Sequence, residues 1–396
     1  MRPDDVVHSS WLAYEEDGRM THFTMAALAS LWLAIVGCGS GPSSPHASTT
    51  PIQSPVATPS PVGMSPSPMA PTPATTGTPA PTPTLATGQW HLFELTSGIP
   101  VYSIDVDPGS REVLLAGTGD GLRSFGIFAS RDGGRTWQSD GLIGAAVVSL
   151  QFDPAGSGDA FALAGNAVCH RAPRPSGEWS VPEGKDPTGP PYETARTLAV
   201  GPGGTLRVSA GGDVSVSRDA GETYAHVAIF PPIDGYECHN VHDVAIAPTD
   251  SSVVYVANVG GLVASTDAGM SWPRIDCPPT LSGRKWGIAV DPTSSMIAYS
   301  GTGSKIRKTA DGGKTSTTFE VGGLDVSALV IDPVESSTIY AGTARGVRVS
   351  HDGGRSWSSL GTDFPAARID DLAIDPVDGR TIYAATDAGV AVFVVP

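Results

Sequence analysis

Carboxylates, arginines and aromatic side chains recur at corresponding points along residues 89–396, and these residue types serve both glycoside hydrolysis and ligand binding. Two carboxyl groups that flank a glycosidic bond can act as an acid and as a base or nucleophile, while guanidinium groups and aromatic rings bind charged and planar groups. The candidates for acid–base chemistry, if the protein is an enzyme, are Asp370, Asp371, Asp243 and Glu237. The candidates for ligand binding are Tyr102, Arg196, His242, Trp286, Asp370, Tyr236, Arg284 and Arg368. No carboxylate pair and no nucleophile with its base is identifiable by spacing, so the catalytic residues stay undefined.

Most of these candidates stand at or just before the start of short apolar strands. Each strand ends in Asp-Pro or a variant, and this pair recurs seven times at intervals of about 44 residues, from Asp107-Pro108 to Asp375-Pro376. The positions one and three residues before the turn are always apolar and should lie in the core. The position five residues before it varies and should form a ring at one mouth of a central channel, occupied by Tyr102, Val148, Arg196, His242, Trp286, Ser327 and Asp370. One residue further along, Asp243 and Asp371 add carboxylates.

A second repeat marks turns between later strands. Its pattern is Ser/Thr-x-Asp-x-Gly-x-Thr/Ser, mostly followed by an aromatic residue. Its aspartates are Asp132, Asp219, Asp267, Asp311 and Asp352, and its tryptophans are Trp137, Trp272 and Trp357. We expect the carboxylate to accept bonds from backbone N–H groups of its own turn, and the glycine to adopt a positive φ. Because the same chemistry recurs in every repeat, we interpret these aspartates as structural.

These turns resemble Asp-boxes, also called BNR repeats, and the resemblance covers residues 89–396. It implies an all-β fold, a single seven-bladed β-propeller of four-stranded blades. The last blade lacks a fourth strand, because the chain stops just after Val390–Val395. We expect Trp90–Leu95 to supply it, so that the N- and C-terminal strands pair and close the ring.

Three branches of Asp-box propellers suggest different functions. Sialidases are six-bladed and have an Arg-Ile-Pro motif, whereas this chain has only Gly98-Ile99-Pro100. Propellers of the xyloglucanase and sortilin type are similar in architecture, but xyloglucanases use two facing propellers, and here only Asp120 and Asp387 fall near the turn that bears their acid. The photosystem II assembly factor type is a single seven-bladed propeller that binds proteins. The resemblance therefore favours a monomeric, non-catalytic module that binds a protein or glycan at the channel mouth, with an exo-acting glycoside hydrolase as the alternative.

The N-terminal segment resembles an export signal. An apolar run over residues 23–37 is short for a membrane span, and Cys38 follows it directly. Ile35-Val36-Gly37-Cys38 resembles the lipobox of bacterial lipoproteins, which implies that 1–37 is a signal peptide, with a possible true start at Met20. Lipidation of Cys38 would then anchor the protein to the outer face of a bacterial membrane. An ordinary signal or anchor helix is the alternative.

The composition limits the classes of molecule that the protein is expected to bind. Residues 38–88 are rich in Pro, Thr and Ser and contain no Asp, Glu, Lys or Arg, which predicts a disordered linker. The chain has 40 acidic and 24 basic residues, a net charge of −16, which disfavours nucleic acid and any membrane contact other than the anchor.

The cysteines fit an exported protein. Cys238 and Cys277 lie just before neighbouring channel strands, so we predict a disulfide between them in an oxidising compartment. Cys169 falls in a strand and should be a buried thiol. Glu237-Cys238-His239 matches no closed zinc pattern, so we expect no metal and no cofactor.

Overall fold

The computed structural model describes residues 85–96, 98–119, 125–164, 167–173, 177–180, 195–210, 213–228, 241–258, 261–273, 287–366 and 368–396. These residues form 27 β-strands and no helix. The predicted all-β class is therefore confirmed, and short strands separated by Gly and Pro turns are the reason that the sequence indicated it.

The strands of the described residues belong to seven antiparallel sheets. The first contains β2 (Val101–Val106), β3 (Leu114–Thr118), β4 (Gly126–Ser130) and β5 (Gln138–Gly141). The second contains β6 (Val147–Phe152), β7 (Ala160–Ala164), β8 (Ala167–Arg171) and β9 (Trp179–Ser180). The third contains β10 (Ala195–Gly201), β11 (Thr205–Ala210), β12 (Asp213–Ser217) and β13 (Ala225–Ala228). The fourth contains β14 (Val241–Ala247), β15 (Asp250–Asn258) and β16 (Gly261–Ser265).

Three further sheets follow along the chain. The fifth contains β17 (Ile288–Val290), β18 (Ala298–Thr302), β19 (Lys305–Thr309) and β20 (Thr317–Glu320). The sixth contains β21 (Val326–Ile331), β22 (Ile339–Thr343), β23 (Gly346–Ser350) and β24 (Ser358–Ser359). The seventh contains β25 (Ile369–Ile374), β26 (Thr381–Thr386), β27 (Gly389–Val394) and β1 (Trp90–Phe93), which precedes all the others in the chain.

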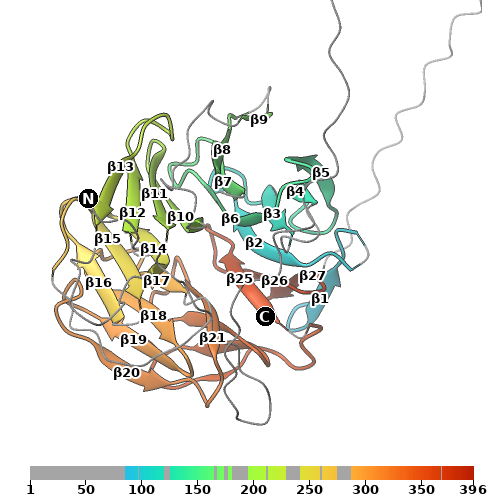
Figure 1. The fold of residues 1–396 in the computed structure, drawn as a ribbon. Helices are drawn as coiled ribbons and strands as arrows, with labels where there is room; N and C mark the ends of the chain where they lie inside the picture. Colours follow the sequence, from blue (N-terminus) through green and yellow to red (C-terminus); the bar gives the residue numbers. More distant parts are fainter. Residues whose placement is uncertain are drawn as a thin grey trace, which may run out of the picture. The chain divides into compact units, whose positions relative to one another are not determined.

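The strands β2, β6, β10, β14, β17, β21 and β25, one from each sheet, lie nearest a common centre (Figure 1). These inner strands contact one another in the order β2, β6, β10, β14, β17, β21 and β25, and β25 contacts β2. Sheets set around a centre in this way form a β-propeller, as the repeats predicted.

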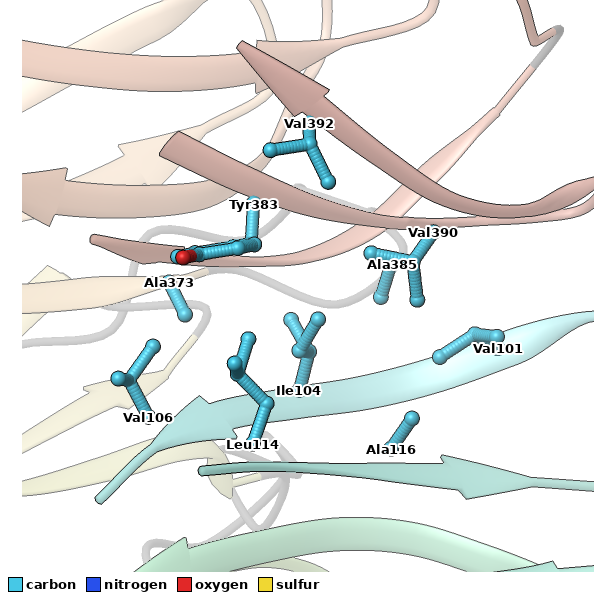
Figure 2. Close-up of a cluster of buried hydrophobic side chains, with 10 residues drawn as sticks. All are labelled: Val101, Ile104, Val106, Leu114, Ala116, Ala373, Tyr383, Ala385, Val390 and Val392. Atoms are coloured by element: carbon cyan, nitrogen blue, oxygen red, sulfur yellow. The ribbon is translucent and has the colours of Figure 1, made fainter. Parts of the chain in front are cut away.

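The inner strands bury one face and turn the other to the centre. In β2, Val101, Ile104 and Val106 lie in the core between the first and seventh sheets, while Ser103 and Asp105 line the central cavity. Figure 2 shows Ile104 and Val106 on the side of Ala373 and Tyr383 of the seventh sheet, and Val101 nearer Ala385 and Val390. The apolar positions before each Asp-Pro turn are therefore core positions, as expected.

A β-bulge interrupts the alternation near the start of six inner strands. The pairing register skips one residue, and the skipped residues are Tyr102, Val148, Arg196, His242, Ser327 and Asp370. They are the variable ring positions of the sequence pattern. A bulge leaves its residue out of the ladder and re-aims the side chain, which explains why this position escapes the apolar pattern of the core.

The five repeated aspartates, which define what we call the Asp turns, form the expected hydrogen bonds. In the turn at Asp352, Oδ1 accepts from the backbone N–H of Ser356 at 2.9 Å and from the Ser350 hydroxyl at 2.8 Å, and Oδ2 accepts from the Ser356 hydroxyl at 2.5 Å. The same three bonds occur at Asp132, Asp219, Asp267 and Asp311. Trp357 Nε1 donates to the Gly354 carbonyl at 3.0 Å and the ring packs against the core. All five carboxylates thus hold their own turns.

Two of the Asp turns contain backbone strain. Ala220 and Ala268 adopt φ of 55° and 62°, where Gly133, Gly312 and Gly353 stand in the other turns. A left-handed conformation is costly for alanine and free for glycine. We therefore expect Ala268→Gly to raise the free energy of unfolding by about 0.5–1 kcal/mol, measured by denaturant titration. Gly353→Ala should lower it by a similar amount, and equal stability of both variants and the wild type would contradict this reading.

The N-terminal strand completes the seventh sheet. β1 pairs antiparallel with β27, with Trp90 opposite Phe393 and Phe93 opposite Val390. The Trp90 ring lies 4.8 Å from that of Phe364, and its Nε1 donates to the Leu360 carbonyl at 2.9 Å. The predicted pairing of the N-terminal strand with the C-terminal strand is therefore present, although β1 ends at Phe93 rather than at Leu95.

The fourth sheet is described only in part. Among the described residues, the sheet of β14, β15 and β16 has three strands. In the other sheets with an Asp turn, the fourth strand begins at or next to the position that Pro273 occupies here, for example Gln138 after Trp137. The residues after Pro273, on which the predicted fourth strand of this sheet falls, lie outside the described residues.

Candidate site at the channel mouth

A cavity of about 360 Å³ lies at the centre of the propeller. The inner strands of all seven sheets line it, and its polar lining comes mainly from the positions two and four residues before each Asp-Pro turn. These polar residues are Ser103, Asp105, Ser149, Gln151, Thr197, Asp243 and Asp371. The cavity is therefore polar although core residues flank it on every side.

Side chains in the cavity wall accept hydrogen bonds from the backbone of the neighbouring inner strand. Ser103 Oγ accepts from Leu150 N at 3.0 Å, and Asp105 Oδ2 accepts from Phe152 N at 2.8 Å. Ser149 and Gln151 bind the next strand in the same way, through Leu198 N and Val200 N. In each pair of strands the later acceptor bonds to the later donor, as with Ser103 to Leu150 and Asp105 to Phe152. These inner strands therefore run parallel and start at the same end of the cavity.

Two acid–base candidates belong to this set of braces. Asp243 Oδ1 accepts from the Thr197 hydroxyl at 2.7 Å and Oδ2 accepts from Ile288 N at 2.8 Å, which ties the third, fourth and fifth sheets together. Asp371 Oδ2 accepts from Ser103 Oγ at 3.1 Å and Ile104 N at 3.2 Å, which joins the seventh sheet to the first. Both carboxylates therefore hold neighbouring sheets in place.

Asp105 is the carboxylate in the cavity wall that sequence reasoning missed. Its side chain is partly buried in the cavity wall, and desolvation raises its pKa from 3.8 to about 7, although N–H bonds from Phe152 and Val106 favour the charged form. The charge of Asp371 raises the pKa further. The signal was available, because a polar residue two places before the turn lies opposite the core face in a strand of period two.

These pKa shifts predict a stability maximum in mild acid. Between about pH 4 and 7 the folded protein keeps a proton on Asp105 that the unfolded chain releases, so the free energy of unfolding should fall as pH rises, by on the order of 3 kcal/mol. Below pH 4 the Asp turns act in the opposite direction. Hydroxyl hydrogen bonds lower the pKa of Asp219, Asp267 and Asp311 to about 2, so their contribution is lost as pH falls toward that value.

Denaturant titrations from pH 3 to pH 8 check this prediction. In Asp105→Asn the decline between pH 4 and 7 should disappear, while the loss of stability in stronger acid should remain. The quantity to compare is the slope of the free energy of unfolding against pH. The free energy itself is lower in the variant at every pH, because the asparagine N–H₂ faces one of the two backbone donors. A wild-type profile that is flat from pH 4 to 7 would refute the assignment to Asp105.

Three predicted ligand-binding residues meet at the start of the inner strands, beyond the cavity. Arg368 Nε donates to Asp370 Oδ2 at 2.8 Å, and its guanidinium lies over the Tyr102 ring, 5.3 Å from the ring centroid. The Asp387 carboxylate accepts from Arg368 N at 3.2 Å. We call Tyr102, Arg368 and Asp370 the mouth cluster; it joins the first and seventh sheets, and the Arg368 side chain is 41% exposed.

For most of the other predicted site residues, the structure does not describe the side chain. His242 lies in β14 and is buried, and Arg196 lies in β10, where its backbone alone is described. The remaining predicted residues lie outside the described residues; they are Trp286, Tyr236, Glu237, Arg284, Cys238, Cys277 and Cys38. The structure thus brings together one part of the predicted ring.

The described ranges contain one free cysteine and no cluster of metal-ligating side chains. No group of three His, Cys, Asp or Glu side chains there could hold a metal ion. Cys169 is a free buried cysteine in β8, as predicted, and burial raises the pKa of its thiol to about 11. Within the part of the chain that is described, no helix is long and apolar enough to cross a membrane.

Comparison with known proteins shows the fold and a local sequence similarity. No family model matches the chain. A segment of 106 residues is 30% identical to the xyloglucanase Xgh74A of Acetivibrio thermocellus, covering 22% of this chain and 13% of that protein. The chain therefore spans a small part of this curated relative.

Solved structures of similar fold include proteins with different roles. The GH74 xyloglucanase from Xanthomonas campestris superposes with a TM-score of 0.56 at 21% identity, over 76% of this chain and 53% of that one. YCF48 bound to a D1 peptide superposes with a TM-score of 0.58 at 13% identity, over 79% of this chain and 99% of that one. The extracellular domain of a B. thetaiotaomicron two-component system superposes with a TM-score of 0.58 at 16% identity, over 77% and 39%. The β-propeller fold is shared, and both hydrolases and a peptide-bound protein have it.

Proposed function

We propose that this propeller is a non-catalytic binding module that takes a protein or glycan ligand on the face around the mouth cluster. The observation that supports this most strongly is that the polar side chains in the cavity wall are bonded to neighbouring strands, whereas those of the mouth cluster are partly exposed. The inward carboxylates Asp243 and Asp371 hold neighbouring strands, whereas Arg368 is oriented by Asp370 and Tyr102 and remains partly exposed at the strand ends. Recognition sites commonly lie on such edges and loops of a rigid scaffold.

The same proposal includes the finer architecture. We infer one closed seven-bladed ring, supported by the contact of β25 with β2 and by the pairing of β1 with β27. We further propose that 1–37 is a lipoprotein signal, that Cys38 is lipidated, and that the linker 38–88 holds a monomeric domain outside a bacterial membrane. A Cys238–Cys277 disulfide belongs to this proposal.

A glycoside hydrolase is the second candidate, favoured by the local identity to a xyloglucanase. It would use two of Asp370, Asp371, Asp243 and Glu237. Release of sugar from xyloglucan or sialyl oligosaccharides by the wild type, abolished by Asp371→Asn in a variant that keeps its fold, would establish this function instead.

Site-specific photo-crosslinking tests the binding face directly. Ile143 is 81% exposed in the loop before β6, at the end where the inner strands start, and Val334 is 67% exposed in the turn after β21, at the opposite end. A photoreactive residue at Ile143 of the anchored full chain should form a discrete adduct in intact cells, and the same residue at Val334 should not. Adducts at Val334 alone, or at neither position, would contradict the proposed face.

A further inference from the structure

The mouth cluster and the central cavity share one seam between the first and seventh sheets. Tyr102 lies three residues before Asp105 in β2, and Asp370 directly precedes Asp371 in β25. Figure 2 shows the core side of this seam, where Ile104 and Val106 of β2 face Ala373 of β25. The cavity side of the same two strands contains Asp105 and Asp371. Any change in the fit of β2 against β25 therefore reaches both the cavity wall and the mouth.

We propose that Asp105 is a proton-sensitive positioning residue whose ionisation loosens the contact between β2 and β25 and thereby the mouth cluster. The inference rests on the proposed function, since it assigns regulation to the proposed binding face. Asp105 is partly buried in the cavity wall, accepts N–H bonds from Phe152 and Val106, and lies near the carboxylate of Asp371, which braces β2 through Ser103 and Ile104.

Among the described residues that line the cavity with Asp105, the charged side chains are those of Asp243 and Asp371, so none of them compensates its charge. The charges of Asp371 in β25 and of Asp107, just after β2, both raise its pKa. The facing strand β6 offers the neutral Ser149 and Gln151, and Asp243 lines the same cavity. Tyr383 of β26 packs on the core side of β2. A proton on Asp105 removes like-charge repulsion with Asp371, and its loss restores that repulsion.

The hydrogen bonds from β2 to Asp371 connect the ionisation of Asp105 to the mouth cluster. Asp371 holds β2 with two hydrogen bonds to Ser103 and Ile104, each longer than 3 Å. Repulsion from an ionised Asp105 should lengthen them and shift β25 away from β2. The stack of Arg368 on Tyr102 depends on both strands, so it should be tightest below neutral pH, and ligand affinity should fall as pH rises through 7.

Tyrosine NMR of the ligand-free full chain tests the coupling. We expect the ring resonances of Tyr102, assigned with Tyr102→Phe, to titrate with a midpoint near pH 7 between pH 5 and 9. Asp105→Asn should abolish this titration and leave the low-pH chemical shift. Asp325→Asn, which removes an exposed aspartate distant in sequence from the seam, should leave it unchanged.

Two results would overturn the coupling. One is a Tyr102 signal that does not move across this range, and the other is a titration that persists in Asp105→Asn. Neither result would affect the proposed binding face, because the measurement uses no ligand. Conversely, if no adduct forms at Ile143 but the Tyr102 resonances titrate, the proposed binding face is wrong and the coupling between Asp105 and Tyr102 still holds.

Discussion

Asp243→Ala is expected to lower the free energy of unfolding by about 3 kcal/mol, because it leaves one donor from each neighbouring sheet, and the N–H of Val244, without their acceptor. The Thr197 hydroxyl and Ile288 N both donate to this carboxylate, from the sheets on either side. Asp243→Asn should lose less, since its carbonyl oxygen can keep one of the two bonds. Denaturant unfolding followed by tryptophan fluorescence measures both effects.

Asp325→Ala provides the matched control for this substitution. Asp325 is exposed beside β21, and its removal should change stability by less than about 0.5 kcal/mol. If Asp243→Ala proves as harmless as Asp325→Ala, the carboxylate does not brace the sheets, and its use in acid–base chemistry becomes the better interpretation.

Trp90→Ala is expected to lower the free energy of unfolding by about 3 kcal/mol, a typical loss for a large aromatic truncated in a packed site. Trp90 packs against Phe364 and Phe393 and donates to the Leu360 carbonyl, so it fixes β1 on the edge of the seventh sheet. Without it, β27 would become an exposed edge strand, which favours aggregation. Thermal unfolding with light scattering should show both changes.

The control for the terminal strand is Glu94→Ala, because Glu94 follows β1 and is exposed. Its variant should unfold like the wild type. A loss below about 1 kcal/mol in Trp90→Ala would mean that β1 adds little to the fold, and would remove the support for ring closure by the terminal strands.

Much of the fold could be predicted because each repeat contains its own local chemistry. The apolar positions before Asp-Pro turns and the hydrogen bonds of the Asp turns depend on residues a few places apart, so their spacing was sufficient. The pairing of Trp90–Phe93 with Val390–Phe393 was predictable for another reason: the last sheet otherwise had one strand too few.

The site was predicted less completely, since its contacts cross between sheets. The variable ring positions were found, but a period-two pattern cannot reveal the bulges at Tyr102 and Asp370 that re-aim their side chains. Asp243 and Asp371 were predicted to add carboxylates at the channel mouth, whereas they lie in the wall of the central cavity. These carboxylates accept from the backbone N–H groups of Ile288 and Ile104. Every residue type except proline has such a group, so the sequence could not indicate that Asp243 and Asp371 brace the sheets.

Hydrogen exchange at two amides tests most directly whether the inward carboxylates brace the sheets. Ile288 N donates to Asp243 and Ile104 N donates to Asp371, so both amides should be strongly protected in the wild type. In Asp243→Ala the amide of Ile288 should lose protection while that of Ile104 keeps it. Rapid exchange of Ile288 in the wild type, or equal protection in both proteins, would show that Asp243 is not engaged by the neighbouring sheet and would contradict the account.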